Sequence, residues 1–171
     1  MHSVQPRPAT FTANGPLRGT VKVPGDKSIS HRSLMLSALA VGESRVSGLL
    51  EGEDVLATAA AMRAMGATIE RTGEGEWRIN GLGVGGLLQP QTALDMGNSG
   101  TSTRLLMGLV ASHAISATFI GDASLSKRPM GRVIVPLSLT GAEFNASPGG
   151  RLPLMVRGIC PAVPISYRLP V

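Results

Sequence analysis

The sequence predicts an α+β fold built from repeated β-α-β-α-β-β units. Stretches typical of strands and of helices alternate in the same order twice along the 171 residues. The hydrophobic fraction of 43% is enough for one well-filled domain or two small ones. Three pairs of identical residues also stand 72 positions apart: Gly25 and Gly97, Arg32 and Arg104, and Ser44 and Ser116. We therefore expect two passes through one structural unit, with chance similarity between two α/β stretches as the alternative.

The first unit is expected at about residues 17–85, after an irregular tail at residues 1–16. Apolar residues at helical spacing indicate its helices, and a Gly/Glu turn separates its last two strands. The elements follow in the order strand, helix, strand, helix, strand, strand, at residues 19–25, 27–40, 44–50, 53–66, 67–71 and 76–80.

The second unit is expected at about residues 90–160 and has the same order of elements. They are placed at residues 92–98, 100–112, 116–122, 129–141, 142–146 and 152–158. Gly66 and Gly141 end the second helix of each unit, a common place for glycine. A third unit starts at residues 164–171, PISYRLPV, where Arg168-Leu169-Pro170 resembles Lys22-Val23-Pro24. We expect the chain to be the front part of a longer protein; the alternative is a terminal strand that caps an existing sheet.

The charge and composition of the chain indicate which kinds of partner it can bind. The net charge of +5 favours anionic partners. Aromatic residues make up only 3% of the chain, which argues against a nucleic-acid partner bound by base stacking. Cys160 is the only cysteine, so an intrachain disulfide is excluded and a reducing compartment is favoured. No signal-peptide pattern or membrane-length apolar segment is found, so we expect a cytoplasmic protein without a membrane partner.

The first candidate site is the helix start in VPGDKSISHRS, residues 23–33. The first N–H groups of a helix have no partners within it and attract anions. Lys27, Ser28 and Arg32 add a compact charge, a hydroxyl and a planar fork that suit phosphate or carboxylate. The competing interpretation is that Ser28 or Asp26 caps the helix and that the cations are merely solvated.

The second candidate site is the helix start in GNSGTSTR, residues 97–104. Asn98 supplies a side-chain amide, and Gly100 allows a ligand to approach the backbone closely. Asn98 as an ordinary helix cap is the alternative.

The third candidate site, GDASLSKRPMGR at residues 121–132, carries Lys127, Arg128 and Arg132. Together the three sites suggest a ligand with more than one negative group, against the alternative of a solvated basic loop. No nucleotide-binding glycine motif is found. His31 has no second ligand at metal-binding spacing, so we expect it to pack or to form hydrogen bonds, and we predict no metal site.

The three motifs, in this order and at this spacing, resemble the 5-enolpyruvylshikimate-3-phosphate synthases, or 3-phosphoshikimate 1-carboxyvinyltransferases. The resemblance runs from about Leu17 to the last residue. It implies domains of three units with helices inside and sheets outward. Residues 17–171 would then be a partial enolpyruvyl transferase domain, with about two of its three units. A C-terminal portion would add the third unit's Ser/Gln motif and a second domain with a catalytic Asp and Glu, so that this chain alone is expected to be inactive.

The resemblance also implies roles. The family transfers the enolpyruvyl group of phosphoenolpyruvate to the 5-hydroxyl of shikimate 3-phosphate, releases phosphate, and uses no cofactor. Lys27 would contact both substrates and is the candidate acid/base, since neighbouring cations favour a neutral amine. Substrate contacts would come from Ser28 and Arg32 for shikimate 3-phosphate, and from Lys27, Asn98, Gly100 and Arg128 for phosphoenolpyruvate. Asp54 matches an acidic position near the site, without an assigned role.

Alternatives remain. One is a phosphometabolite-binding module without catalysis, and another is a small RNA-binding domain. The sister family that acts on UDP-N-acetylglucosamine has Lys-Asn in place of Lys27-Ser28 and a reactive cysteine in the loop matching residues 121–132, which this chain lacks. Leu105 stands where many members have proline, as in the subgroup poorly inhibited by glyphosate, but the alanine that marks that subgroup is Gly100 here. We therefore expect glyphosate inhibition, relieved by Gly100→Ala.

Overall fold

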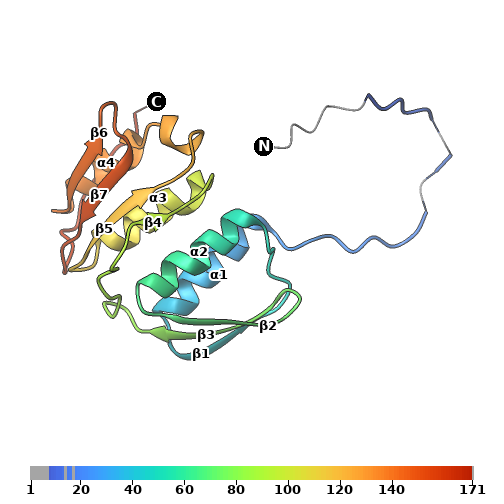
Figure 1. Ribbon diagram of the computed structural model, residues 1–171, viewed down its shortest axis with the longest axis horizontal. Coiled ribbons are helices and arrows are strands. Elements are labelled where there is room, and N and C mark those ends of the chain that lie inside the picture. The colour runs from blue at the N-terminus through green and yellow to red at the C-terminus, as the bar shows by residue number, and fades with distance from the viewer. Residues whose placement is uncertain (1–7, 14, 17, 171) are drawn as a thin grey trace.

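The α+β fold class is confirmed, with helices inside and sheets outward (Figure 1). The computed structural model describes residues 8–13, 15–16 and 18–170, so part of the predicted tail and the predicted limits Leu17 and Val171 lie outside the described residues. Each of two sheets carries two helices on one face, and α2 (Glu53–Ala64) contacts α3 (Gly100–Ala111) between the sheets. Within the described residues, no helix is both long and apolar enough to cross a membrane.

The first sheet is antiparallel and contains β1 (Val41–Val46), β2 (Thr68–Gly73) and β3 (Glu76–Leu82) in the order β1-β3-β2. Helices α1 (Lys27–Leu39) and α2 pack on its inner face. Trp77 and Ile79 stand two positions apart on β3, and both are buried against the helices. This two-residue period is typical of a strand with one buried face.

The second sheet has the order β4-β5-β7-β6, and its elements repeat the pairing of the first sheet. Strands β5 (Ser116–Ile120), β6 (Glu143–Ser147) and β7 (Arg151–Arg157) pair antiparallel, and β4 (Leu94–Asp95) adds a short parallel strand to β5. Helix α3, the 3-10 turn η1 (Leu125–Lys127) and α4 (Gly131–Ser138) complete it.

The repeat extends to side chains. Arg32 Nη1 donates to Ser28 O at 3.0 Å, and Arg104 Nη1 donates to Gly100 O at 3.1 Å, one turn back on α1 and α3 respectively. Gly66 and Gly141 follow α2 and α4 with φ of +101° and +98°, which is the conformation that favours glycine at a helix end. The two units therefore share an arginine contact in the first helix and a glycine with positive φ after the second.

One predicted strand is wrong. Residues 19–25 form no strand: Val21 and Val23 are exposed, and the outer edge of β1 has no partner strand among the described residues. The segment comes close to the sheet only at its end, where a side chain at Gly25 would collide with the carbonyl oxygen of Gly48. Residues 164–170 are largely exposed and form no strand, which argues against the alternative of a terminal strand that caps a sheet. The third unit expected to start at residues 164–171 stays a prediction.

Other boundaries shift. The strand predicted at residues 44–50 is β1, at Val41–Val46, because Leu49 N donates instead to Gly75 O in the turn between β2 and β3. The strand predicted at residues 92–98 shortens to Leu94–Asp95. The helix predicted at residues 129–141 shortens to Gly131–Ser138.

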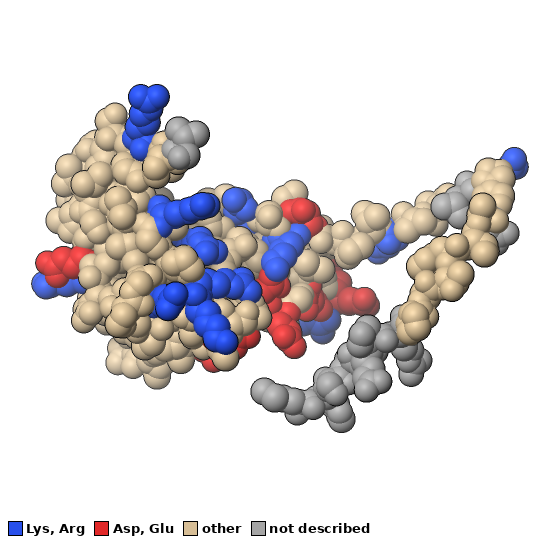
Figure 2. Space-filling view, turned by 90° about the horizontal axis from the view of Figure 1, so that it is seen from above, with Lys and Arg blue, Asp and Glu red and all other residues tan. Residues whose placement is uncertain are grey.

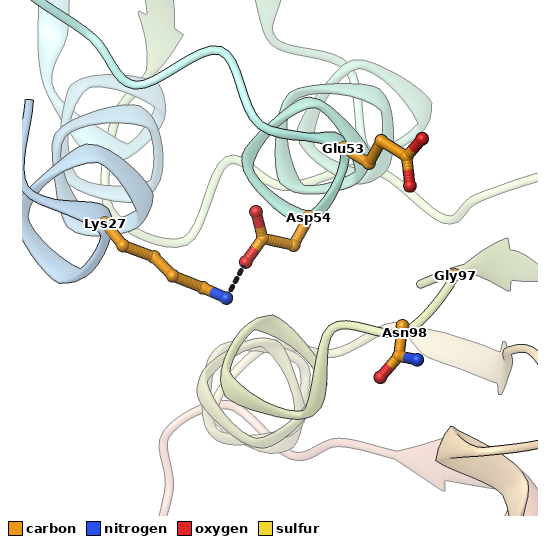
Figure 3. A pocket seen from close by; sticks show the side chains of 5 residues that line it. All are labelled: Lys27, Glu53, Asp54, Gly97 and Asn98. Carbon is orange, nitrogen blue, oxygen red and sulfur yellow. Dashed lines mark ion pairs between the residues drawn. The ribbon is translucent and has the colours of Figure 1, made fainter. Parts of the chain in front are cut away.

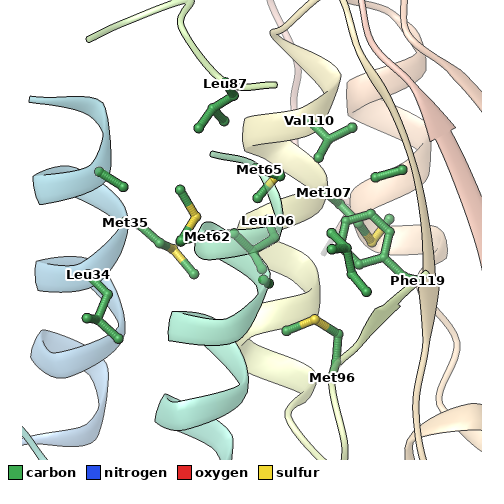
Figure 4. Close-up of a cluster of buried hydrophobic side chains, with 14 of the residues drawn as sticks. Leu34, Met35, Met62, Met65, Leu87, Met96, Leu106, Met107, Val110 and Phe119 are labelled. Atoms are coloured by element: carbon green, nitrogen blue, oxygen red, sulfur yellow. The ribbon is translucent and has the colours of Figure 1, made fainter. Parts of the chain in front are cut away.

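The hydrophobic core lies between α1, α2 and α3 and extends to β5 and β7 (Figure 4). Buried side chains include Leu34, Met35, Met62, Met65, Ile79, Met96, Leu106, Met107, Val110, Phe119 and Leu154. Because the core is continuous from the first sheet to the second, it fixes the starts of α1 and α3 relative to each other.

Glu51, in the loop before α2, ties the first sheet to that loop. Its carboxylate accepts two hydrogen bonds from Arg71, both at 2.7 Å, one from Trp77 Nε1 at 2.9 Å and one from Gly75 N at 3.1 Å. The Arg71 hydrogen bonds, opposed by desolvation and aided by Gly75 and Trp77, lower the pKa of Glu51 to about 2 from an ordinary 4.5.

A pH dependence of stability is expected from Glu51. Its folded-state pKa is depressed, so its contribution to the free energy of unfolding is complete above pH 4.5 and is lost as the pH falls toward about 2. Glu51→Gln should lower the urea midpoint at pH 6 and make its decline between these pH values shallower. Urea unfolding at a series of pH values measures this, and parallel curves for the two proteins would contradict the assignment.

Candidate functional site at the starts of α1 and α3

The start of α1 presents Lys27 to the start of α2. Asp26 caps α1 by accepting a hydrogen bond from Ile29 N at 2.8 Å, so the capping role considered for Ser28 falls to Asp26. Lys27 is the first residue of the helix, and its ammonium forms an ion pair with Asp54 near the start of α2. The Lys27 side chain is 54% exposed and that of Asp54 only 17%. The pair thus has one accessible partner, the cation.

A pocket of about 360 Å³ opens at this ion pair. Lys27, Glu53, Asp54, Gly97 and Asn98 line it. Lys27 and Asp54 point toward each other, whereas the side chains of Glu53 and of Asn98, in the loop before α3, point away from that pair (Figure 3). The starts of α1, α2 and α3 therefore meet at one place, although they lie far apart in the sequence.

Asp54 is held as a carboxylate. Desolvation by burial opposes its ionisation, but the hydrogen bond and the charge of Lys27, with a smaller effect of His31, keep the pKa of Asp54 below its ordinary value. An anionic ligand that reaches Lys27 would therefore compete with Asp54 for the ammonium.

The start of α3 places Asn98 between two charged groups. Ser99 caps this helix, accepting from Ser102 N at 3.3 Å, so the Asn98 side chain is not used as the cap. Asn98 Nδ2 donates to Asp122 Oδ2 at 3.0 Å, and Asn98 Oδ1 accepts from Arg128 Nη2 at 2.6 Å. Asp122 thus fixes the orientation of the amide that receives Arg128.

Gly100 lies beneath two guanidinium groups. A Cβ atom at this position would stand 2.9 Å from Arg104 Nη1 and 3.1 Å from Arg128 Nη1. Both guanidinium groups therefore approach the α3 backbone as closely as glycine permits. A planar anion beside these guanidinium groups would meet donors on several sides.

The other predicted polar residues do not line the pocket. Ser28 and Arg32 are exposed at the α1 start and do not line the pocket with Lys27. Lys127 and Arg132 are exposed on either side of Arg128. Figure 2 shows Lys and Arg side chains gathered on one face of the body, which gives this face a positive field.

The sequence analysis did not identify Thr58 and Ser102, and it assigned Asp54 no role. The structure brings together Asp54 and Lys27, and it joins His31 to Thr58 and Ser102, at 2.8 Å and 3.1 Å from His31 Nδ1. The prediction that His31 forms hydrogen bonds is confirmed. Within the part of the chain that the structure describes, no group of three or more His, Cys, Asp and Glu side chains could hold a metal ion.

The chain is similar to known proteins of one family. A family model described as EPSP synthase (3-phosphoshikimate 1-carboxyvinyltransferase) matches residues 11–171. Among curated proteins, the 3-phosphoshikimate 1-carboxyvinyltransferase of Novosphingobium aromaticivorans is 81% identical over 165 residues, covering 96% of this chain and 37% of the relative. That of Zymomonas mobilis is 75% identical over 156 residues, covering 91% of this chain and 34% of the relative.

A solved structure of EPSP synthase from Acinetobacter baumannii superposes with a TM-score of 0.85 at 49% identity, covering 89% of this chain and 34% of that one. The chain thus spans little more than a third of the length of the relatives that it matches. Since the family model covers nearly all of it, the chain belongs to the EPSP synthase (3-phosphoshikimate 1-carboxyvinyltransferase) family.

Proposed function

We propose that the complete protein transfers the enolpyruvyl group of phosphoenolpyruvate to the 5-hydroxyl of shikimate 3-phosphate and releases inorganic phosphate. The observation that carries the proposal is the convergence of Lys27, Asn98 and Arg128 at the starts of two helices in a member of this family. Three groups that can hold anions, beside two helix starts, suit two phosphorylated substrates. Charged substrates of this kind also favour a cytoplasmic site of action.

Each residue has a proposed role. Arg128 and Asn98 hold the anionic groups of phosphoenolpyruvate above Gly100, while Ser28 and Arg32 bind shikimate 3-phosphate from the exposed side of the α1 start. Lys27 contacts both substrates. The C-terminal portion of the protein supplies the remaining groups of the site.

The reaction proceeds by addition and elimination. The 5-hydroxyl oxygen attacks C2 of phosphoenolpyruvate, its proton passes to a base, and an acid protonates the methylene carbon to give a tetrahedral intermediate. Loss of a proton from the new methyl group and departure of phosphate then form the enol ether. Lys27 is the proposed acid/base within this chain, and the cations stabilise the charge of both substrates as they approach.

The test is phosphate release from phosphoenolpyruvate plus shikimate 3-phosphate. It is run on this chain and on the product of its gene read to the first stop codon. Activity in the longer product alone supports the proposal and a need for the C-terminal portion. If neither product releases phosphate but either one binds shikimate 3-phosphate, the chain is a phosphometabolite-binding module instead.

Glyphosate inhibition is expected to depend on Gly100. A methyl group there would stand 3.1 Å from Arg128 Nη1 and 2.9 Å from Arg104 Nη1, so both guanidinium groups must shift to make room. We expect Gly100→Ala to raise the half-inhibitory concentration of glyphosate by about tenfold or more, equivalent to about 1.4 kcal/mol. An inhibition curve left unchanged by the substitution would refute this. Gly108→Ala, at a helical position with open space, is the matched control.

A further inference from the structure

His31 is a fully buried titratable side chain that stands behind the Lys27–Asp54 ion pair and has no part in the proposed reaction. Its Nδ1 atom lies 2.8 Å from Thr58 Oγ1 on α2 and 3.1 Å from Ser102 Oγ on α3. Ser102 Oγ is in turn 2.6 Å from Oγ of Ser99, the cap of α3. The imidazole is therefore held by hydroxyl groups of the two neighbouring helices.

The opposite ring nitrogen points at the site. His31 Nε2 is 3.5 Å from Asp54 Oδ2, the oxygen that faces Lys27, and it has no hydrogen-bond partner within the described residues. A bare lone pair on Nε2 would face a carboxylate oxygen and be repelled by it. A proton on Nε2 removes this repulsion, and either hydroxyl can then donate to Nδ1. The surroundings thus favour the tautomer with the proton on Nε2.

The charged groups around His31 favour its neutral form. Desolvation by burial lowers the pKa of His31 below 6.5, although Asp54 on α2 acts in the opposite direction. Lys27 and Arg32, on the same helix as His31, lower it further, and α3 contributes only the hydroxyls of Ser99 and Ser102. Near neutral pH, His31 is then an uncharged donor aimed at a largely buried carboxylate.

We propose that His31 is a positioning residue that frees Lys27 for anionic substrates, because its Nε2–H remains as a partner of Asp54 when a substrate draws the ammonium away. Without this donor, release of Lys27 would leave the Asp54 carboxylate, whose side chain is only 17% exposed, without a facing donor side chain. Asp54 would then retain Lys27 more tightly. The inference rests on the proposed function in one respect, since it takes Lys27 as a substrate contact.

Two substitutions separate the two sides of the ring. In His31→Gln the side-chain amide reaches toward the position of Nε2, so a donor toward Asp54 is retained. In His31→Asn the shorter amide lies near the position of Nδ1, so the contact with Thr58 and Ser102 is retained and the donor toward Asp54 is lost. Both variants remove the titrating ring.

The measurement is made on the product of the complete gene. For His31→Asn we expect the dissociation constant of shikimate 3-phosphate, by calorimetry, and its KM to rise by about tenfold, with kcat changed less than about threefold. His31→Gln should stay within about threefold of the wild type in all three. Equal losses in both variants, or a fall confined to kcat, would overturn the proposal.

The pKa of His31 gives a second readout. Withdrawal of Lys27 removes a cation that lowers the pKa of His31 and leaves the Asp54 carboxylate that raises it, so binding should raise the pKa of His31. Nitrogen-15 titration of the wild-type imidazoles with and without shikimate 3-phosphate measures the change. A pKa that falls on binding or stays unchanged would contradict the proposal.

The tautomer of His31 can be tested on the wild-type protein, so this test does not depend on whether a variant folds. Nitrogen-15 spectra of the wild-type imidazoles should show the His31 proton on Nε2 at pH 7, and a proton on Nδ1 would overturn the proposal. Failure of the proposed function is seen separately. If the wild type binds shikimate 3-phosphate without turnover, the proposed reaction is refuted, and the binding comparison of the two variants still tests the role of His31. If the wild type neither binds nor reacts, the position of the His31 proton is the remaining test of that role.

Discussion

Replacement of Lys27 by methionine is expected to lower kcat for phosphate release in the complete protein by about 10²–10⁴-fold, the usual range for loss of a general acid or base. Methionine keeps most of the aliphatic stem and removes only the ammonium. The side chain is 54% exposed at the pocket, so its loss should leave the α1 start in place. Substrate binding should weaken as well, because the ammonium is proposed to contact both substrates.

Lys22→Met is the matched control for this prediction. Lys22 is an exposed lysine that precedes α1 by a few residues, and it does not line the pocket with Asp54. Its replacement removes the same charge from the same region and should leave kcat unchanged. A comparable loss in both variants would show that net charge, rather than the position of Lys27, controls the rate.

The substitution also reports on Asp54. The hydrogen bond and charge of Lys27 are what overcome the desolvation of this carboxyl. In Lys27→Met the pKa of Asp54 should therefore rise above its wild-type value, because desolvation then acts with less opposition. Carboxyl carbon-13 titration by NMR measures the difference. An unchanged titration would mean that the ion pair does not persist in solution.

The helices could be predicted closely because their pattern is local. Residues 27–40, 53–66 and 100–112 were expected to be helical, and the structure has Lys27–Leu39, Glu53–Ala64 and Gly100–Ala111. Apolar residues at helical spacing next to a polar cap specify such elements without reference to the rest of the chain. The strand predicted at residues 19–25 failed for the opposite reason. A strand must pair with another strand, and the local sequence does not show whether residues 19–25 pair with the outer edge of β1.

The candidate site could be predicted only where a helix start carries it. Lys27 and Asn98 were found because cations and amides at helix starts have a direct physical use. Thr58 and Ser102 were not found, since a hydroxyl inside a helix is unremarkable until α2 and α3 pack together and place the two oxygens 2.7 Å apart. Asp122 was missed in the same way, because aspartate is common in turns and its bond to Asn98 spans two loops.

Arg128→Ala is expected to raise the KM for phosphoenolpyruvate roughly 100-fold, as loss of a charged hydrogen-bonding group from a phosphate or carboxylate generally does. Arg128 is placed by Asn98 Oδ1 at 2.6 Å and by Ser124 Oγ at 3.3 Å, so its guanidinium is held near the α3 start before substrate arrives. Lys127→Ala is the matched control, because Lys127 is the adjacent exposed cation. Steady-state kinetics with each substrate varied in turn measures both.

Asp122→Asn tests whether this placement matters. Asp122 Oδ2 accepts from Asn98 Nδ2, and the amide thereby turns its oxygen to Arg128. With asparagine at position 122 the two amides can still pair, but either can turn around, and Asn98 then presents a donor to Arg128 in part of the population. The KM for phosphoenolpyruvate should rise less than in Arg128→Ala, by about tenfold, while the KM for shikimate 3-phosphate stays near its wild-type value. A rise only in the KM for shikimate 3-phosphate would contradict the assignment and would show that Arg128 binds shikimate 3-phosphate instead of phosphoenolpyruvate.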